Sequence, residues 1–324
     1  MPAPRFLKTL LARLRPGAVR IFNWASGKPP STGFADYAHT LIMPKRLFGI
    51  QDRHFWESEC RRLTMSSRLK GDDILCRALG RYKMVVYAGD HSLGPNLIAD
   101  GFWEIWITAM IVKAIEPGMV CIDAGANIGY YTIIMADMAS WAGKVIAAEP
   151  APSTFEFLQK NKRLNDEGHI QLLNVAFGAE AGTASFFVPR DEPKNASFFE
   201  RTDLAPADVE TVETRVIPID ALDLPRVDFV KIDVEGAERM VWDGMQQTIA
   251  RSPDIQIVME INAARDPDID GFLAEITALF PLRVVNYWGD PEPITADQIR
   301  SDPADVMLYL SRRTPAERKA AKAR

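Results

Sequence analysis

Cysteine is scarce in this sequence, which has three, Cys60, Cys76 and Cys121, among its 324 residues. No two of them have Cys-x-x-Cys spacing, and Cys121 lies inside an apolar run that predicts a strand. An odd number of scattered cysteines excludes a disulfide framework and provides no zinc-binding set. We therefore expect reduced thiols in a cytoplasmic protein.

Long apolar runs are also absent. No stretch of about 18 apolar residues occurs, so no transmembrane helix is expected. Lys8, Arg13 and Arg15 interrupt the apolar residues near the N-terminus, which argues against a secretory signal. On a helical wheel one apolar arc holds Phe6, Leu7, Leu10, Leu11 and Leu14. This arc predicts a basic amphipathic helix that ends near Pro16.

The amphipathic helix has two interpretations that the sequence leaves open. It can dock on the body of the protein or on a second copy in a homodimer. It can equally make peripheral contact with a membrane, at the inner face if the protein is cytoplasmic.

Positive charge is scarce outside the two ends of the chain. Residues 1–28 and 312–324 are basic, whereas residues 29–311 hold 26 Lys and Arg against 42 Asp and Glu, a net charge of -16. An acidic body repels nucleic acid, so we expect no nucleic-acid partner, while the basic ends can contact an anionic surface.

The chain is expected to have three parts, an N-terminal helical extension, one α/β domain and a basic tail, over residues 1–80, 81–311 and 312–324. Within the extension the pattern is helical and mixed over 51–79, after a linker over 25–50. A strand is expected over 81–90 and a helix over 101–118, closed by Pro117 and Gly118.

Strands and helices alternate in the rest of the domain. The expected strands cover residues 119–125, 144–150, 170–178, 227–236, 255–262, 282–288 and 305–311. Helices follow the first, second, fourth and fifth strands, which predicts a doubly wound, mostly parallel sheet with ligands at the carboxyl ends of its strands. After the third strand, two strand-like segments flank a polar stretch, and we expect an inserted hairpin at about 183–222 with a mobile tip.

The turn after the first of these strands has the pattern Asp-x-Gly-x-Asn-x-Gly, formed by Asp123, Gly125, Asn127 and Gly129. A dinucleotide fold would have Gly-x-Gly-x-x-Gly around a pyrophosphate, which the Asp123 carboxylate would repel. S-adenosylmethionine has no phosphate and carries a sulfonium and an ammonium, so it tolerates that carboxylate. Glu149 closes the next strand and can accept both hydroxyls of an adenosine ribose, a role common to both cofactor classes.

A second acidic turn lies in "VDFVKIDVEGAE", residues 227–238. Asp233 closes a strand and is expected to face the crevice where a methyl group is presented. Glu235 and Glu238 have the alternative role of complementing the start of a helix.

Four segments carry a family resemblance: "PGMVCIDAGANIGYYTIIMA", "VIAAEPAPSTFEFLQKNKRLN", "VDFVKIDVEGAERMVWDG" and "IVMEI". In this order and spacing the chain resembles the FkbM family of S-adenosylmethionine-dependent methyltransferases, over roughly residues 101–288. The resemblance implies a class I methyltransferase fold and usually O-methylation of a hydroxyl, often on a sugar or polyketide. Residues 1–80 have no counterpart in it.

The resemblance also implies a cofactor site. Carried over by position, its residues are Glu104, Asp123, Gly125, Asn127, Gly129, Tyr130, Thr132, Glu149, Asn174 and Ala176. Glu104 is the candidate for the amino-acid end of the cofactor, and Asn174 to Ala176 would lie near the adenine. Many class I enzymes have an acid there and this chain has none, so backbone contacts to the adenine are expected.

The expected acceptor is a hydroxyl on a glycan, a glycolipid or a small molecule, and such a hydroxyl needs help to lose its proton. Asp233 or Glu235 is the candidate base. A divalent metal held by Asp233, Glu260 and Asn262 is the alternative. The metal-free route is favoured because the four histidines, His39, His54, His91 and His169, match no motif of the family.

Three other functions are alternatives. An NAD-dependent nucleotide-sugar oxidoreductase is disfavoured by the Asp123 turn and by the lack of a Tyr-x-x-x-Lys set. A nucleic-acid methyltransferase would need a basic groove and, for base amino groups, an Asn-Pro-Pro-Tyr-like loop where this chain has "DVEG". A non-catalytic protein that only binds S-adenosylmethionine remains open.

Overall fold

The computed structural model describes residues 42–165, 168–189, 197–198 and 205–322. The chain divides into two compact units, residues 1–42 and 43–324, and all helices and strands named below belong to the second unit. The expected amphipathic helix, and most of the expected linker, lie outside the described residues. In the part of the chain that is described, no helix has the length and apolar character needed to cross a bilayer.

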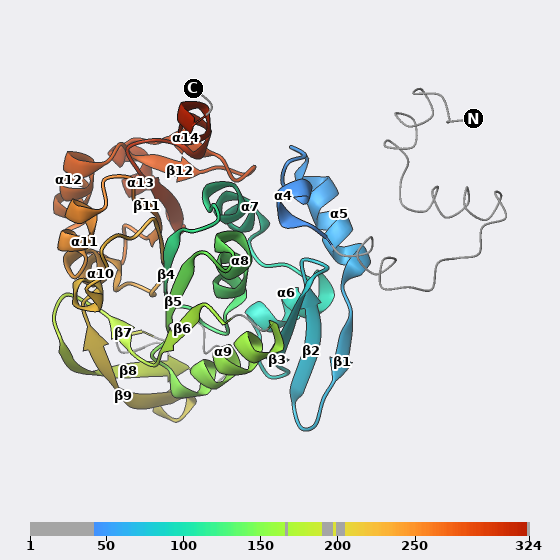
Figure 1. Ribbon diagram of the computed structural model, residues 1–324. Coiled ribbons are helices and arrows are strands. Elements are labelled where there is room, and N and C mark those ends of the chain that lie inside the picture. Colours follow the sequence, from blue (N-terminus) through green and yellow to red (C-terminus); the bar gives the residue numbers. More distant parts are fainter. Residues whose placement is uncertain (1–41, 166–167, 190–196, 199–204, 323–324) are drawn as a thin grey trace, which may run out of the picture. The chain divides into compact units, whose positions relative to one another are not determined.

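An eight-stranded sheet forms the centre of the unit, in the order β13-β12-β14-β11-β10-β4-β5-β6. Its strands are β4 (Val120–Ala124), β5 (Lys144–Ala148), β6 (Ile170–Leu173), β10 (Phe229–Ile232), β11 (Gln256–Ile261), β12 (Arg283–Val285), β13 (Pro291–Pro293) and β14 (Val306–Leu310). The strands from β11 to β6 are parallel, and β14 runs antiparallel to β11 and β12. This order confirms the doubly wound, mostly parallel α/β sheet of the expected class I fold (Figure 1).

The sheet changes direction between β4 and β10. From β4 the chain moves outward through β5 and β6, and from β10 it moves the other way through β11. At such a switch point the loops after neighbouring strands diverge and leave a crevice at the carboxyl ends. Ala124 and Ile232 are paired in register at this edge, so the loops after both strands begin side by side.

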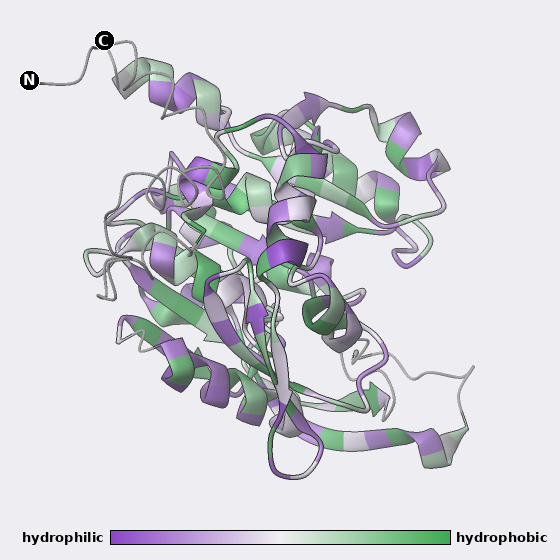
Figure 2. Cartoon of the chain, turned by 90° about the vertical axis from the view of Figure 1, so that its right-hand side faces the viewer, coloured by the Kyte–Doolittle hydropathy of each residue, from purple (hydrophilic) through white to green (hydrophobic). Residues whose placement is uncertain are grey.

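Helices cover both faces of the sheet. On one face lie α7 (Ile105–Ala114), α8 (Tyr130–Ala139) and α9 (Pro152–Asn165), and on the other α10 (Glu238–Asp243), α11 (Gln246–Arg251) and α12 (Ile269–Leu279), with α13 (Ala296–Ser301) beside α12. Hydrophobic colour is concentrated along the strands, and the helices carry both hydrophobic and hydrophilic residues (Figure 2). Strands buried on both faces become nearly continuous apolar runs, which is why they were readable from the sequence.

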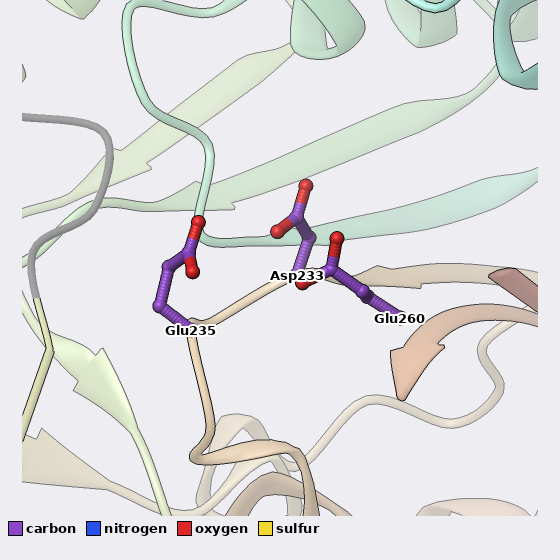
Figure 3. Close-up of side chains that lie close together, drawn as sticks. All are labelled: Asp233, Glu235 and Glu260. Atoms are coloured by element: carbon purple, nitrogen blue, oxygen red, sulfur yellow. The ribbon is translucent and has the colours of Figure 1, made fainter. Parts of the chain in front are cut away.

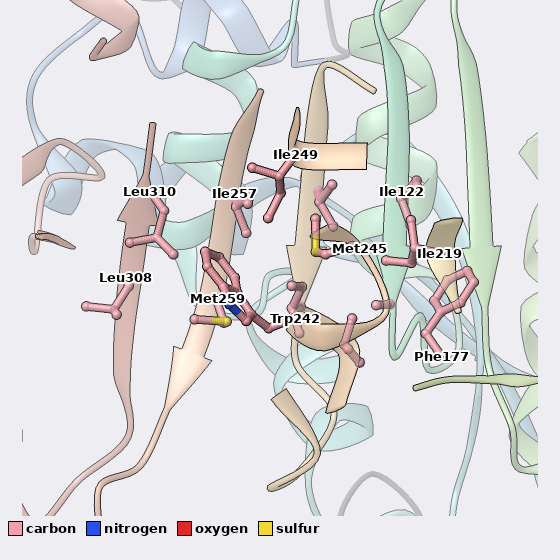
Figure 4. Packing of buried hydrophobic residues seen from close by; sticks show 14 of the residues in the cluster. Ile122, Phe177, Ile219, Trp242, Met245, Ile249, Ile257, Met259, Leu308 and Leu310 are labelled. Atoms are coloured by element: carbon pink, nitrogen blue, oxygen red, sulfur yellow. The ribbon is translucent and has the colours of Figure 1, made fainter. Parts of the chain in front are cut away.

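A large cluster of core residues lies between the sheet and α10 to α12. Ile122, Ile257 and Leu308 face it from the strands, and Trp242 enters it from α10 (Figure 4). The Trp242 ring packs edge-on against Phe272, with 6.0 Å between centroids. Burying a large apolar side chain contributes about 1.5–3 kcal/mol, so this layer fixes the strands that carry the site.

The described part of the N-terminal region contains a small sheet, of which the sequence predicted one strand, over residues 81–90. After α4 (Pro44–Leu47) and α5 (Arg53–Leu63), the strands β1 (Ser66–Arg68), β2 (Asp73–Ala78) and β3 (Tyr82–Tyr87) pair antiparallel, and α6 (Leu93–Ala99) follows. The expected helical pattern over 51–79 is therefore wrong after Leu63. Leu79 and Gly80 both adopt positive φ and turn β2 back onto β3, and this pairing overrides the local helical preference.

Two other expected elements differ from the structure. The helix expected over 101–118 begins only at Ile105, because Gly101 and Glu104 have positive φ. The strand expected over 170–178 breaks at Asn174, whose side chain donates to the carbonyls of Glu149 and Pro150. Beyond the break, β7 (Ala176–Phe177) joins a separate sheet.

That separate sheet has the order β7-β9-β8, with β8 (Gly182–Pro189) and β9 (Val209–Ile217) paired antiparallel. The short helices η2 (Pro206–Asp208) and η3 (Ile219–Leu222) flank β9. The tip between β8 and β9, which we expected to be mobile, falls mostly outside the described residues. The chain ends in α14 (Pro315–Lys322), within the expected basic tail.

Candidate functional site

The turn after β4 is shaped by two glycines. Gly125 has φ of 77°, and a Cβ placed there would lie 1.9 Å from the carbonyl oxygen of Asp233. Gly129 has φ of 93°, and its Cβ would lie 2.6 Å from the Leu158 side chain. Only glycine combines this backbone conformation with so close an approach, so the turns after β4 and β10 are packed directly against each other.

Asp123 lies beneath this turn and is completely buried. Its Oδ2 accepts a hydrogen bond of 2.6 Å from Thr132, and its Oδ1 has no hydrogen-bond partner among the described residues. Burial raises the pKa of Asp123 to about 6, although Lys231 on the neighbouring strand lowers it. Asp123 and Thr132 hold the turn from below, and neither of these two residues lines the cavity described next.

A cavity of about 360 Å³ opens at the switch point, where the sequence predicted ligand binding. Nine of the residues assigned from the sequence line it: Glu104, Gly125, Asn127, Tyr130, Glu149, Ala176, Asp233, Glu235 and Glu260. Five others are not part of its wall: Asp123, Gly129, Thr132, Asn174 and Asn262. The structure therefore brings together residues from six separate segments of the chain.

Glu149 is held by the backbone on both of its oxygens. Oε2 accepts from the amide of Asn127 and Oε1 from the amide of Ala151, each at 2.9 Å. Burial raises the pKa of Glu149 to about 7, in spite of these two amides. Each carboxylate oxygen has further lone pairs, so Glu149 can also accept hydroxyl donors from a ligand.

Three carboxylates meet at the ends of β10 and β11. Asp233, Glu235 and Glu260 offer oxygens that all lie within 4.8 Å of one another (Figure 3). Asn262, expected in this group, instead donates to Asp305 at 2.8 Å and accepts from the amide of Ala264. Glu235 thus takes the place that the sequence gave to Asn262.

Two cations, Lys231 and Arg265, compensate these acids, and the sequence analysis assigned neither to the site. Arg265 lies 3.1 Å from Glu235, 3.5 Å from Glu260 and 3.3 Å from Asp305. Even so, burial and the carboxylates of Asp233 and Glu235 raise the pKa of Glu260 to about 9. The cluster therefore holds a proton readily.

Lys231 is a charged side chain inside the sheet, with 1% of its surface exposed. Its Nζ lies 2.8 Å from Asp233 and 4.8 Å from the centre of the Tyr131 ring. Burial lowers the pKa of Lys231, but the carboxylates of Asp233 and Asp123 raise it by more than burial lowers it. The pKa of Lys231 therefore lies above its usual value, and the side chain is a cation. A lysine within the apolar strand "VDFVKI" was the sequence signal for this residue.

Glu104 reaches the cavity from the segment before α7. It has φ of 33°, a left-handed conformation that is strained for a residue with a side chain. Its carboxylate accepts a 2.8 Å hydrogen bond from the hydroxyl of Tyr131. The preceding residue of α8, Tyr130, shares a 3.0 Å hydrogen bond with Thr108 inside the core.

Part of the remaining, apolar wall of the cavity comes from the β7-β9-β8 sheet and the segment beside it. Phe186 and Phe198 pack edge-on with 5.3 Å between ring centres, next to Ala151. Ser197 donates a 2.9 Å hydrogen bond to the carbonyl of Glu235, which ties this sheet to the acidic turn. No sequence motif marked Phe186 or Phe198 as part of a site.

Comparison with known proteins gives a family match. Residues 123–312 match the model of the methyltransferase FkbM domain, which is more than half of the chain. A solved FkbM methyltransferase from Methylobacillus flagellatus is 18% identical, with a TM-score of 0.39, and the match covers 61% of this chain and 44% of that one.

Curated relatives are methyltransferases by name. Methyltransferase 1 of Beauveria bassiana is 31% identical over 38% of this chain, but the match spans only 57% of that protein. The hexuronic acid methyltransferase AglP of Haloferax volcanii is 28% identical, over 52% of this chain and 67% of its own length. The 31-O-demethyl-FK506 methyltransferase FkbM of Streptomyces tacrolimicus is 30% identical, over 51% of this chain and 72% of its own length.

Proposed function

The chain belongs to the FkbM methyltransferase family, and we propose that it transfers a methyl group from S-adenosylmethionine to a hydroxyl, most simply that of a sugar in a glycan, glycolipid or secondary metabolite. The observation that carries this proposal is the charge of the cavity. Its carboxylates are Glu104, Glu149, Asp233, Glu235, Glu260 and Asp305. Among the described residues of the wall, Lys231 and Arg265 are the cations that oppose them, so the wall favours a sulfonium cation and repels the pyrophosphate of NAD.

The other residues of the cavity fit the same cofactor. Gly125 allows close approach to the backbone, and Glu149 offers lone pairs to ribose hydroxyls. Val175 and Phe186 supply apolar surface suited to an aromatic base.

The acids at the ends of β10 and β11 are suited to receive the proton that the acceptor hydroxyl loses. Asp233 and Glu235 are the proposed bases, because a sugar hydroxyl is a weak nucleophile at neutral pH and gains from a positioned carboxylate. We propose that no metal is needed. Arg265 already lies against Glu235 and Glu260 and supplies the positive charge that a cation would otherwise bring.

The names of two relatives support a hydroxyl acceptor. One acts on a hexuronic acid, and the other on a compound named for its missing O-methyl group. On this basis we propose a hydroxyl acceptor for this chain. We also propose that the enzyme is cytoplasmic and works at the inner face of a membrane. That location rests on the sequence of residues 1–28.

A transfer assay tests the proposal directly. Labelled S-adenosylmethionine is incubated with the protein and with glycan and glycolipid fractions from the cell envelope. Since either carboxylate can be the base, Asp233→Asn and Glu235→Gln are both made, and at least one should lower turnover by about 100-fold or more. Asp72→Asn, an exposed acid between β1 and β2, serves as the matched control and should keep full turnover.

Three results would count against parts of this proposal. Tighter binding of NAD than of S-adenosylhomocysteine would reject the cofactor. Full turnover in both acid variants would reject the proposed bases. Loss of turnover on chelation, restored by a divalent cation, would replace the metal-free route by the metal-dependent one.

A further inference from the structure

Lys231 has a position that the proposed chemistry leaves unexplained. It is a cation in the wall of the cavity, at the centre of the sheet, where an isolated charge costs several kcal/mol to bury. An ammonium group has three donors, and Asp233 is the hydrogen-bond partner of Lys231 in the described residues. Two donors are therefore available to a ligand in the cavity.

Tyr131 joins Lys231 to Glu104. The Tyr131 ring lies against the Lys231 ammonium, and the hydroxyl of the same ring donates to Glu104. The Lys231 cation thus lies over the ring of Tyr131 and the Glu104 anion lies at its hydroxyl. Both Lys231 and Glu104 line the cavity. Glu104 is also held in a left-handed conformation, a kind of local strain that concentrates at binding sites.

We infer that Lys231 and Glu104 bind the α-carboxylate and the α-ammonium of the methionine end of the cofactor, with Lys231 as the carboxylate-binding residue. The inference rests on the proposed use of S-adenosylmethionine. An amino-acid zwitterion needs one group of each charge at the end of its site. Among the described residues that line the cavity, Lys231 and Arg265 are the cations, and Arg265 already contacts three carboxylates.

Two other roles for Lys231 make different demands. A proton acceptor would have to be neutral, whereas the carboxylates of Asp233 and Asp123 keep Lys231 charged. A purely structural role, in which Lys231 only neutralises Asp233, would not depend on the carboxylate of a ligand. Ligands with and without the amino-acid end therefore separate the binding role from the structural role.

The test is calorimetry with S-adenosylhomocysteine and 5′-methylthioadenosine, which keeps the adenosine and the sulfur but lacks the amino-acid end. The variants are Lys231→Met, close to lysine in length, and Glu104→Gln. In both, we expect the affinity for S-adenosylhomocysteine to fall at least tenfold, as the loss of a charge-assisted hydrogen bond predicts. The affinity for 5′-methylthioadenosine should change by less than about twofold. Glu149→Gln is the control, because it should weaken both ligands.

The inference is overturned if Lys231→Met and Glu104→Gln lower the affinity for both ligands equally, or if neither variant lowers the affinity for S-adenosylhomocysteine. If Lys231→Met does not give a cooperative melting transition, Glu104→Gln decides by the same criterion, together with Lys231→Arg, which should retain much of the preference for S-adenosylhomocysteine. Wild-type protein that binds neither ligand overturns the proposed cofactor itself. That result differs from one in which the wild-type protein binds both ligands and the variants lose affinity for both equally, which overturns only the inference about Lys231 and Glu104.

Discussion

Glu149 shows how a single buried carboxylate can make ligand binding depend on pH. Burial raises its pKa to about 7, so near neutral pH a large fraction of the free protein carries a proton on this group. A ribose donates hydrogen bonds through its hydroxyls and needs acceptors, which the ionised carboxylate provides best. Binding should therefore select the deprotonated form and release the proton.

We predict that the affinity for S-adenosylhomocysteine rises between pH 6 and pH 8, by at most roughly tenfold per pH unit, and levels off above the pKa of Glu149. The sign follows because protonation competes with the ligand below that pKa. Titration calorimetry across this range measures the slope. In Glu149→Gln the dependence should disappear, and an equal slope in the variant would assign the effect to another group.

At the residue scale, the sequence indicated cavity-lining groups at strand ends and missed one that lies inside the sheet. Asp233 and Glu149 could be predicted because each follows an apolar strand. Lys231 lies two residues before the end of such a strand, and only the fold places it beside Asp123 and Asp233. Arg265 was missed because its three carboxylate partners come from different segments.

At the scale of elements, the site depends on the contact between the turns after β4 and β10. The amide of Asp233 donates to the carbonyl of Ala124, and the Asp233 carbonyl fills the space beside Gly125. The acidic turn cannot move away from the first turn without breaking this contact. The position of the proposed base Asp233 thus depends on Gly125, a glycine in the turn after another strand.

Gly125→Ala should disrupt this contact. The left-handed backbone alone costs about 1–3 kcal/mol for a non-glycine residue, and the added methyl group would collide with the Asp233 carbonyl. We expect a lower free energy of unfolding in urea and weaker binding of S-adenosylhomocysteine. Gly182→Ala is the matched control, because nothing lies within 4 Å of the added Cβ, and it should change stability by no more than about 0.5 kcal/mol. Similar losses in the two variants would contradict the argument.

The order of elements was predictable where local pattern and fold agree. Apolar runs that end in turns gave the parallel strands, because strands covered on both faces must be apolar. The break at Asn174 was not predictable, since it depends on contacts with the carbonyls of Glu149 and Pro150, far away in the sequence. The strands β1 and β2 were missed for a related reason, because pairing with β3 fixes their conformation.

At the scale of the whole molecule, charge is distributed so that the acidic part would avoid an anionic surface. Residues 29–311 carry a net charge of -16, and six carboxylates line the cavity. This suits a cationic cofactor but opposes approach to an anionic bilayer. Residues 1–28, which lie outside the described part of the chain, supply six cations and the apolar arc expected to overcome that repulsion.

We predict that the full chain co-sediments with anionic lipid vesicles and that a chain lacking residues 1–28 does not. Each cation near the anionic surface contributes roughly 1 kcal/mol to binding, and the five apolar side chains contribute by inserting into the bilayer. Such binding is reversible and weakens as the salt concentration rises. Leu10→Gln with Leu14→Gln keeps the charge and removes part of the arc, so it should lower recovery in the pellet. If the arc instead forms a dimer contact, the truncated chain becomes monomeric in equilibrium sedimentation without lipid, and both chains appear equally in the vesicle pellet. That pair of results would reject the membrane contact.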